Sequence, residues 1–124
     1  MKEKKIRVLF SPDFDSDYME LLEEIEVETR KGIRNSFNMQ LAKAINRAIE
    51  LLKINPEYGV HVPKNRIPRT FIEKYEINNL WKVNLPDRWR LCYTLRTNRI
   101  EVLVVLLGFM SHKDYDKLFG YRRR

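Results

Sequence analysis

The strongest constraint on the fold is a run from Ile100 to Phe109 that is apolar at almost every position. Such a run is typical of a strand that is covered on both faces. Two earlier stretches, Leu80 to Leu85 and Trp89 to Arg96, alternate apolar with polar residues, which is the period of a strand. Pro86-Asp87 and Thr97-Asn98 separate them as tight turns. The C-terminal half therefore predicts three consecutive antiparallel strands.

The N-terminal half predicts one strand and two helices. Apolar residues alternate with others from Ile6 to Phe10, which indicates a short first strand. Ser11-Pro12 is a helix-start signature, and apolar residues recur at helical spacing after it. A second, longer helix is predicted from about Gly32 until Asn55-Pro56 ends it.

These elements define an α+β fold with the order β-α-α-β-β-β and a short C-terminal helix within His112 to Phe119. The prolines and scattered charges from Glu57 to Asn79 predict an irregular surface connection. We expect two helices on one face of a mainly antiparallel sheet, with the other face partly open. Because 124 residues without an internal linker suit one core, residues 1–124 are predicted to form a single domain.

Charge is divided unevenly along the chain. Met1 to Val62 carries 10 Lys and Arg against 11 Asp and Glu, whereas Pro63 to Arg124 carries 14 against 6. The stretch from Val8 to Thr29 holds eight acidic residues and no basic one. The basic excess predicts a surface that attracts a polyanion, for which RNA is the expected candidate.

Several classes of site are poorly supported by the residues available. Cys92 is the single cysteine and lies in an apolar strand pattern, which favours a buried thiol. His61 and His112 are the only histidines, and the chain has no Gly-rich phosphate loop and no CxxC. We therefore expect no metal and no cofactor. The absence of a signal peptide and of a long apolar segment predicts a cytoplasmic protein without membrane contact.

Basic side chains are predicted to gather on the strands. Lys82 lies on the first strand of the three, and Arg90 on the second, between Trp89 and Leu91. An Arg held by such neighbours suits bidentate capture of a phosphate. The alternative is a solvent-facing Arg that pairs with Glu101 or Asp87, and we favour this alternative for Arg88 and Arg96.

A second candidate cluster follows the apolar strand. His112 titrates near neutral pH in its unperturbed state, and Tyr115 lies three residues later on the same face of a helical turn. Together they could serve as acid, base or stacking platform. A capping or surface role for His112 stays open as the alternative.

The residues from Leu80 to Tyr93, LWKVNLPDRWRLCY, resemble the central hairpin of toxins of the RelE/ParE superfamily. The segment Gly108 to Leu118 resembles their last strand followed by His-x-x-Tyr. This resemblance implies a RelE-like fold and a toxin of a toxin-antitoxin system, similar to mRNA interferases of the RelE, YoeB and HigB type. It implies ribosome-dependent, metal-free cleavage of mRNA, in which a 2′-OH attacks the adjacent phosphorus and leaves a 2′,3′-cyclic phosphate.

The resemblance also implies roles for individual residues. Arg90 would stabilise the developing negative charge, His112 would transfer a proton, and Tyr115 would orient the scissile nucleotide. Lys82 would bind phosphate or activate the nucleophile, while Glu73 or Glu76 could be the base. Asn84 stands where some nucleases of the family carry a second basic residue. The expected contacts with the RNA backbone are Lys64, Arg66, Arg69, Lys74 and Arg88.

The implied partners are the ribosome with its mRNA and a cognate antitoxin whose acidic or amphipathic segment would cover the basic strands. Two other functions stay open. One is a ParE-like toxin that inhibits gyrase without cleaving RNA. The other is a nucleic-acid-binding module without toxicity.

Overall fold

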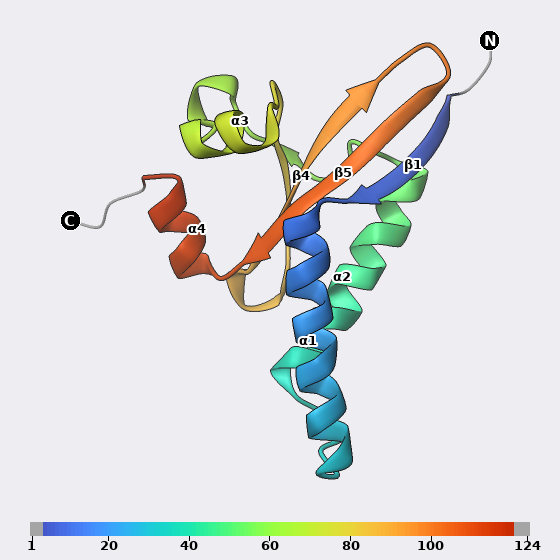
Figure 1. The fold of residues 1–124 in the computed structure, drawn as a ribbon, viewed down its shortest axis with the longest axis vertical. Coiled ribbons are helices and arrows are strands. Elements are labelled where there is room, and N and C mark those ends of the chain that lie inside the picture. Colours follow the sequence, from blue (N-terminus) through green and yellow to red (C-terminus); the bar gives the residue numbers. More distant parts are fainter. Residues whose placement is uncertain (1–3, 121–124) are drawn as a thin grey trace.

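A computed structural model describes residues 4–120 of the chain. Its described part is an α+β fold built on a five-stranded mixed sheet with helices on both faces (Figure 1). The sheet order is β1-β5-β4-β3-β2. The elements along the chain are β1 (Lys5–Phe10), α1 (Pro12–Arg30), α2 (Phe37–Ile54), β2 (Val60–His61), the 3₁₀ turn η1 (Lys64–Arg66), α3 (Arg69–Tyr75), β3 (Trp81–Asn84), η2 (Pro86–Arg88), β4 (Arg90–Thr97), β5 (Glu101–Met110) and α4 (His112–Leu118).

The sheet confirms the predicted strands and adds a parallel pair. The strands β3, β4 and β5 are antiparallel neighbours, and β5 pairs on its other side with β1 in parallel register, from Lys5 opposite Glu101 to Phe10 opposite Leu106. The apolar strand β5 is therefore flanked on both sides by other strands. Its side chains also pack on both faces, Val104 and Leu106 in one core cluster and Leu107 in another, which explains why its sequence lacks the alternation of a half-exposed strand.

The two long helices begin at serine caps. The backbone N–H of Phe14 donates to Ser11 Oγ at the start of α1, as the Ser-Pro signature predicted, and that of Met39 donates to Ser36 Oγ in α2. The predicted start of the second helix at about Gly32 was wrong. Gly32 has φ +83° and lies in the turn after α1, because only a residue that tolerates the left-handed region fits there.

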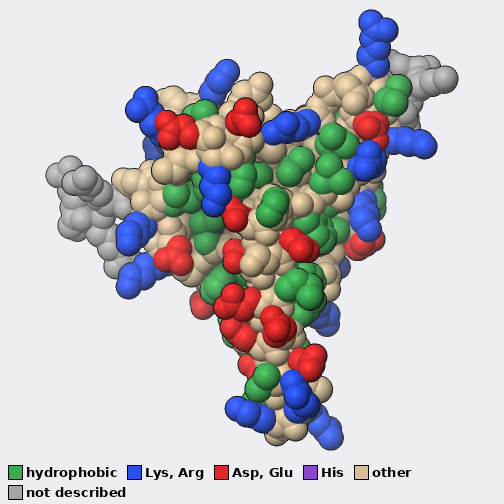
Figure 2. All heavy atoms as spheres, in the orientation of Figure 1, with side chains coloured by type: hydrophobic (Ala, Val, Ile, Leu, Met, Phe, Trp, Pro, Cys, Tyr) green, Lys and Arg blue, Asp and Glu red, His purple; other side chains and the backbone are tan. Residues whose placement is uncertain are grey.

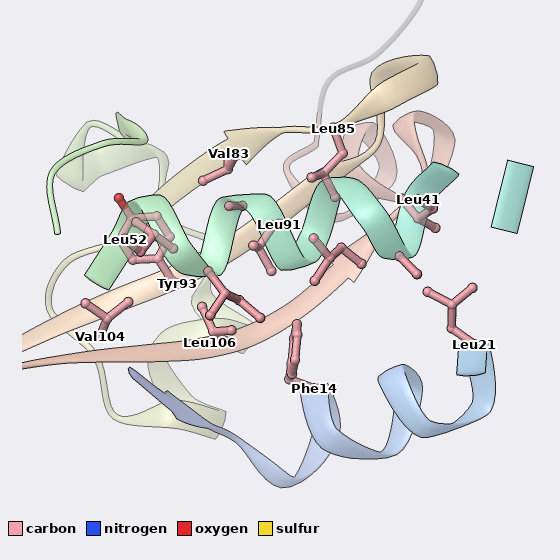
Figure 3. Close-up of a cluster of buried hydrophobic side chains, with 14 residues drawn as sticks. Phe14, Leu21, Leu41, Leu52, Val83, Leu85, Leu91, Tyr93, Val104 and Leu106 are labelled. Atoms are coloured by element: carbon pink, nitrogen blue, oxygen red, sulfur yellow. The ribbon is translucent and has the colours of Figure 1, made fainter. Parts of the chain in front are cut away.

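One face of the sheet packs against α1 and α2. Figure 3 shows Phe14 and Leu21 from α1 and Leu41 and Leu52 from α2 directed toward the side chains of β3, β4 and β5. The strand residues on this face include Val83, Leu85, Leu91, Tyr93, Val104 and Leu106. Burial of this cluster follows the predicted alternation and fixes which strand residues must point to the other face.

The other face of the sheet is covered in part, and Arg7 of β1 stays exposed on it, which agrees with the prediction that this face is partly open. The connection that was predicted to be irregular contains β2, which forms the edge strand beside β3, and also η1 and α3, which pack with α4 over this face. The side chains of this second cluster are Val62, Ile67, Phe71, Ile77, Leu80, Cys92, Leu107 and Tyr115. In Figure 1, α3 and α4 lie near each other, away from α1 and α2. Within residues 4–120, no helix has the length and apolar character needed to span a membrane.

Candidate functional site

Two cations lie against one aromatic ring on the face covered by α3 and α4. Lys82 Nζ is 5.1 Å from the centre of the Tyr115 ring, and Cζ of the Arg90 guanidinium is 5.5 Å from it. Both distances are within the range of cation–π attraction. Lys82, Arg90 and Tyr115, together with His112 and Asp116 of α4, are called the cationic cluster below.

The end of β5 and the cap of α4 bring this cluster together. Met110, the last residue of β5, pairs with Arg90 at the start of β4, so α4 begins beside that arginine. Ser111 Oγ accepts the backbone N–H of Asp114 and fixes the first turn of α4. Tyr115 is thereby directed back over the strands, onto the face of β3 and β4 that carries Lys82 and Arg90.

Arg90 is held by the main chain. Its Nη1 donates hydrogen bonds to the carbonyl oxygens of Arg88, at 2.6 Å, and of Trp89, at 3.2 Å. Its Nε is buried and has no hydrogen-bond partner within the described residues. The alternative partner Glu101 instead pairs with Arg7 of β1, at 3.2 Å. The guanidinium is thus held in one orientation by main-chain acceptors, while its Nε is shielded from solvent.

His112 pairs with a carboxylate that sequence reasoning missed. Its Nε2 is 3.2 Å from Asp116 Oδ2, one turn further along α4. The side chains are 24% and 30% exposed, so both can be reached from solvent. Nδ1 of His112 is buried and has no hydrogen-bond partner in the part of the chain that the structure describes. The spacing of His112 and Asp116 on a predicted helix was the available signal for this pair.

The electrostatics of the cluster lower the pKa of Lys82 below its ordinary value of 10.5. Burial of the ammonium group is the main cause, and the nearby charge of Arg90 is the second. Cys92, the buried neighbour, and Asp116 act in the opposite direction. Lys82 is therefore easier to deprotonate than an exposed lysine. Burial likewise raises the pKa of the Cys92 thiol to about 12, which agrees with its prediction as an inert buried residue.

Tyr115 lies inside the fold, beneath the two cations. Only 2% of its surface is exposed, and its ring stacks on that of Phe119 at a centroid distance of 4.1 Å. In this conformation the ring supports Lys82 and Arg90, and it does not form an open surface on which a base could stack.

The residues expected to contact RNA backbone lie on three separate elements. Lys64 and Arg66 are in η1, Arg69 and Lys74 are in α3, and Arg88 is in the turn before β4; all five are exposed. Lys74 is committed to an ion pair, because its Nζ lies 2.6 Å from Asp13 Oδ2 of α1. Exposed positions suit contacts with a polyanion, although the pair with Asp13 reduces the charge that Lys74 can offer.

The remaining predicted residues lie outside the cationic cluster. Glu73 is exposed on α3, and Glu76 follows it with φ +52° at the end of that helix. Arg96 is exposed, as expected, and donates to the carbonyl oxygen of Tyr75 at 3.1 Å. Asn84 pairs with Arg90 across the β3–β4 ladder. Among residues 4–120, no group of His, Cys, Asp and Glu side chains could hold a metal ion.

Comparisons with known proteins give one structural similarity. No family model matches the sequence, and no curated protein matches it. The structure is similar to that of a YoeB/ParE toxin from Agrobacterium tumefaciens, with a TM-score of 0.48 and 16% sequence identity over 86% of this chain and 98% of the toxin.

Proposed function

We propose that the protein is a toxin of a toxin-antitoxin system that acts in the cytoplasm and cleaves mRNA on the ribosome without a metal. The supporting observation is the cationic cluster, in which Lys82 and Arg90 converge on Tyr115 next to the His112–Asp116 pair. Attack of a 2′-OH on the adjacent phosphorus needs proton transfer at two oxygens and positive charge beside the phosphorane. The cluster contains side chains of both kinds.

Arg90 supplies the fixed positive charge in this proposal. Hydrogen bonds to two carbonyl oxygens hold its guanidinium, so little reorganisation is needed when negative charge develops on the phosphate. Lys82 adds a second charge on the neighbouring strand. Its lowered pKa also lets it serve as a proton acceptor in its neutral form.

His112 is the proposed proton donor to the leaving 5′-oxygen. Asp116 holds its Nε2 side and orients the imidazole, so Nδ1, which is buried and has no partner among the described residues, is the nitrogen proposed to transfer the proton. Glu73 and Glu76 remain alternatives for the base. Tyr115 orients the nucleotide in this proposal indirectly, by holding the two cations in place.

The surroundings of the cluster suit a large RNA substrate. Lys64, Arg66, Arg69 and Arg88 are exposed and can contact phosphates of mRNA or ribosomal RNA, each with a modest share of the affinity. A toxin of this kind needs a cognate antitoxin that keeps it inactive. No small-molecule cofactor enters the proposed reaction.

Paired substitutions test the proposal in a reconstituted translation reaction with a defined mRNA. Arg90→Gln and His112→Ala are compared with Arg47→Gln on the exposed surface of α2 and with His61→Ala, which make the same chemical changes outside the cluster. We expect cleavage to fall at least about 100-fold in the first two variants and less than about threefold in the controls. Fragments with 2′,3′-cyclic phosphate ends identify the reaction. Folded cluster variants that cleave as fast as their controls would show that the proposal is wrong.

The burial of Tyr115 favours a second candidate, a ParE-like toxin that inhibits gyrase. Such an inhibitor needs no open ring for base stacking. A supercoiling assay with purified gyrase distinguishes the two, because only the inhibitor blocks supercoiling while leaving mRNA intact. Normal growth of cells that express the chain without any antitoxin would instead indicate a nucleic-acid-binding module that is not toxic.

A further inference from the structure

A groove with acidic sides runs along α1 and meets the cationic cluster at α4. Two adjoining cavities of about 390 and 400 Å³ flank the helix, and they share Asp17, Phe109, Met110 and Asp114 as lining residues. The first extends between α1, α2 and the end of β5, and the second extends toward α3. The two cavities together are called the acidic groove below.

The floor of the acidic groove is apolar. Trp89, Phe109 and Met110 are partly exposed there, above the buried side chains of Leu21 and Leu41. Trp89 and Phe109 also contact each other, with ring centres 6.3 Å apart. Partly exposed aromatic and sulfur-containing side chains in a hollow are typical of surfaces that bind another protein.

Carboxylates line the sides of the groove. Asp17, Glu20 and Glu24 follow one another at helical spacing on α1, and Asp114 faces them from α4. None of these four forms an ion pair within residues 4–120, while Glu24 accepts a hydrogen bond from the Asn38 side chain at 3.2 Å. Figure 2 shows acidic side chains along α1 with hydrophobic ones between them. At 1.5 Å per residue, the three carboxylates of α1 extend over about 10 Å, which is two turns of a helix.

We propose that the acidic groove binds a basic, amphipathic segment of a partner protein. Apolar side chains of this segment would cover Trp89, Phe109 and Met110, while Lys or Arg at matching spacing would pair with the carboxylates. Charge selects this occupant. The four unpaired carboxylates repel RNA and anionic lipid. The protein as a whole carries a net charge of +7, so a basic segment is repelled by the rest of its surface. Lys74 is the only basic residue among the described lining residues, and Asp13 already neutralises it.

This surface differs from the one that the resemblance implies for an antitoxin, where an acidic segment would cover the basic strands. It does not depend on the proposed nuclease activity. The two surfaces meet at α4, which directs Asp114 to the acidic groove and Tyr115 to the cationic cluster. A partner in the groove therefore contacts the helix that supports Lys82 and Arg90.

The test uses the full chain and a fluorescein-labelled helical peptide of Lys and Leu, with leucines on one face and lysines on the other. Binding is measured by fluorescence anisotropy. The triple variant Asp17→Asn, Glu20→Gln, Glu24→Gln removes carboxylates that line the groove. The control variant Asp15→Asn, Glu23→Gln, Glu26→Gln removes the same charge from residues of α1 that do not line it.

We expect the groove variant to weaken binding at least tenfold and the control variant to weaken it less than twofold. A peptide in which glutamine replaces every leucine should also bind at least tenfold more weakly, because the apolar floor contributes. Equal losses in the two variants would reduce the effect to general electrostatic attraction and overturn the proposal. Equal binding of both peptides, or no binding by the wild-type chain, would overturn it as well.

Discussion

The ammonium group of Lys82 on β3 lies 5.1 Å from the ring centre of Tyr115 on α4, so a strand and the C-terminal helix share one cation–π contact. Arg90 approaches the same ring, at 5.5 Å. Two positive charges therefore lie close together over a buried aromatic residue. Their mutual repulsion and partial burial make the protonation of Lys82 a sensitive measure of the geometry of the cluster.

The pKa of Lys82 is expected to respond in opposite directions to two substitutions. Arg90→Gln should raise it toward 10.5, because a repelling charge is removed, and Asp116→Asn should lower it further, because an attracting charge is removed. Titration of the lysine side chain by NMR measures both changes. A pKa that stays the same in both variants would show that the three groups do not interact.

Lys82 also affects stability. Because the pKa of Lys82 is lower in the folded state than in the unfolded state, keeping Lys82 protonated reduces the stability of the fold at neutral pH. This loss of stability disappears as the pH rises from the pKa of the folded state to the unfolded value of 10.5. Lys82→Met is therefore expected to raise the melting temperature at pH 7 and to change it less at pH 11. Lys43→Met, on the exposed surface of α2, serves as the control and should leave the melting temperature nearly constant at both pH values.

Asp116 is expected to position His112 for proton transfer. Asp116→Ala should lower kcat for mRNA cleavage by about tenfold to a hundredfold, since an imidazole without its partner no longer holds one orientation. Asp116→Asn should retain most of the activity, because the amide oxygen still accepts a hydrogen bond. Asp114→Ala on the same helix is the control. If Asp116→Ala and Asp114→Ala cleave equally fast, Asp116 has no positioning role.

The contacts of α3 with α1 predict a pH-dependent attachment. Lys74 and the hydroxyl of Tyr75 both contact Asp13 Oδ2, each at 2.6 Å, and together they lower the pKa of Asp13 below 3.8. The stabilisation by these contacts is present above pH 3.8 and is lost as the pH falls through the lowered pKa of Asp13 in the folded state. The double variant Lys74→Met, Tyr75→Phe should cost about 1 kcal/mol. Relative to the wild-type chain, amide hydrogen exchange in this variant should accelerate more in α3 than in α2. Equal acceleration in both helices would contradict a local attachment.

Gly59 predicts a steric effect at the edge of the sheet. A β-carbon at this position would lie 2.5 Å from the carbonyl oxygen of Lys82 and 2.8 Å from the Tyr93 hydroxyl. Gly59→Ala is therefore expected to cost about 1–3 kcal/mol in urea unfolding, because the chain must move away from β3. Gly108→Ala is the matched control, since a β-carbon there has no neighbour within 4 Å. Similar losses in both variants would refute the close approach as the cause.

Local patterns in the sequence predicted the helices and strands that depend mainly on residues close to them in the sequence. Alternation located β3 and β4, the apolar run located β5, and Ser11-Pro12 located the start of α1. Alternation along β3 and β4 also places Lys82 and Arg90 on the face opposite α1 and α2, as their contacts with Tyr115 show. These features follow from the periods of strands and helices alone.

Features that depend on distant contacts were missed. The helix α3 is short and is surrounded by prolines and charges, and it is held by the packing of Phe71 with α4 and by the contacts with Asp13. The same contacts with Asp13 occupy Lys74, which sequence reasoning assigned to RNA. The burial of Tyr115 also depends on the way α4 folds back over the sheet, which spacing along the chain does not reveal.

The pairing of β1 with β5 affects how the chain can fold during synthesis. Leu9 and Phe10 leave the ribosome long before their partners Val105 and Leu106. A nascent chain that lacks β5 has neither the neighbour of β1 nor the second neighbour of β4. Because so distant a pairing forms late, the sheet can be completed only after β5 has been made. The cationic cluster, which needs α4 after β5, therefore cannot form in a nascent chain that ends before these elements.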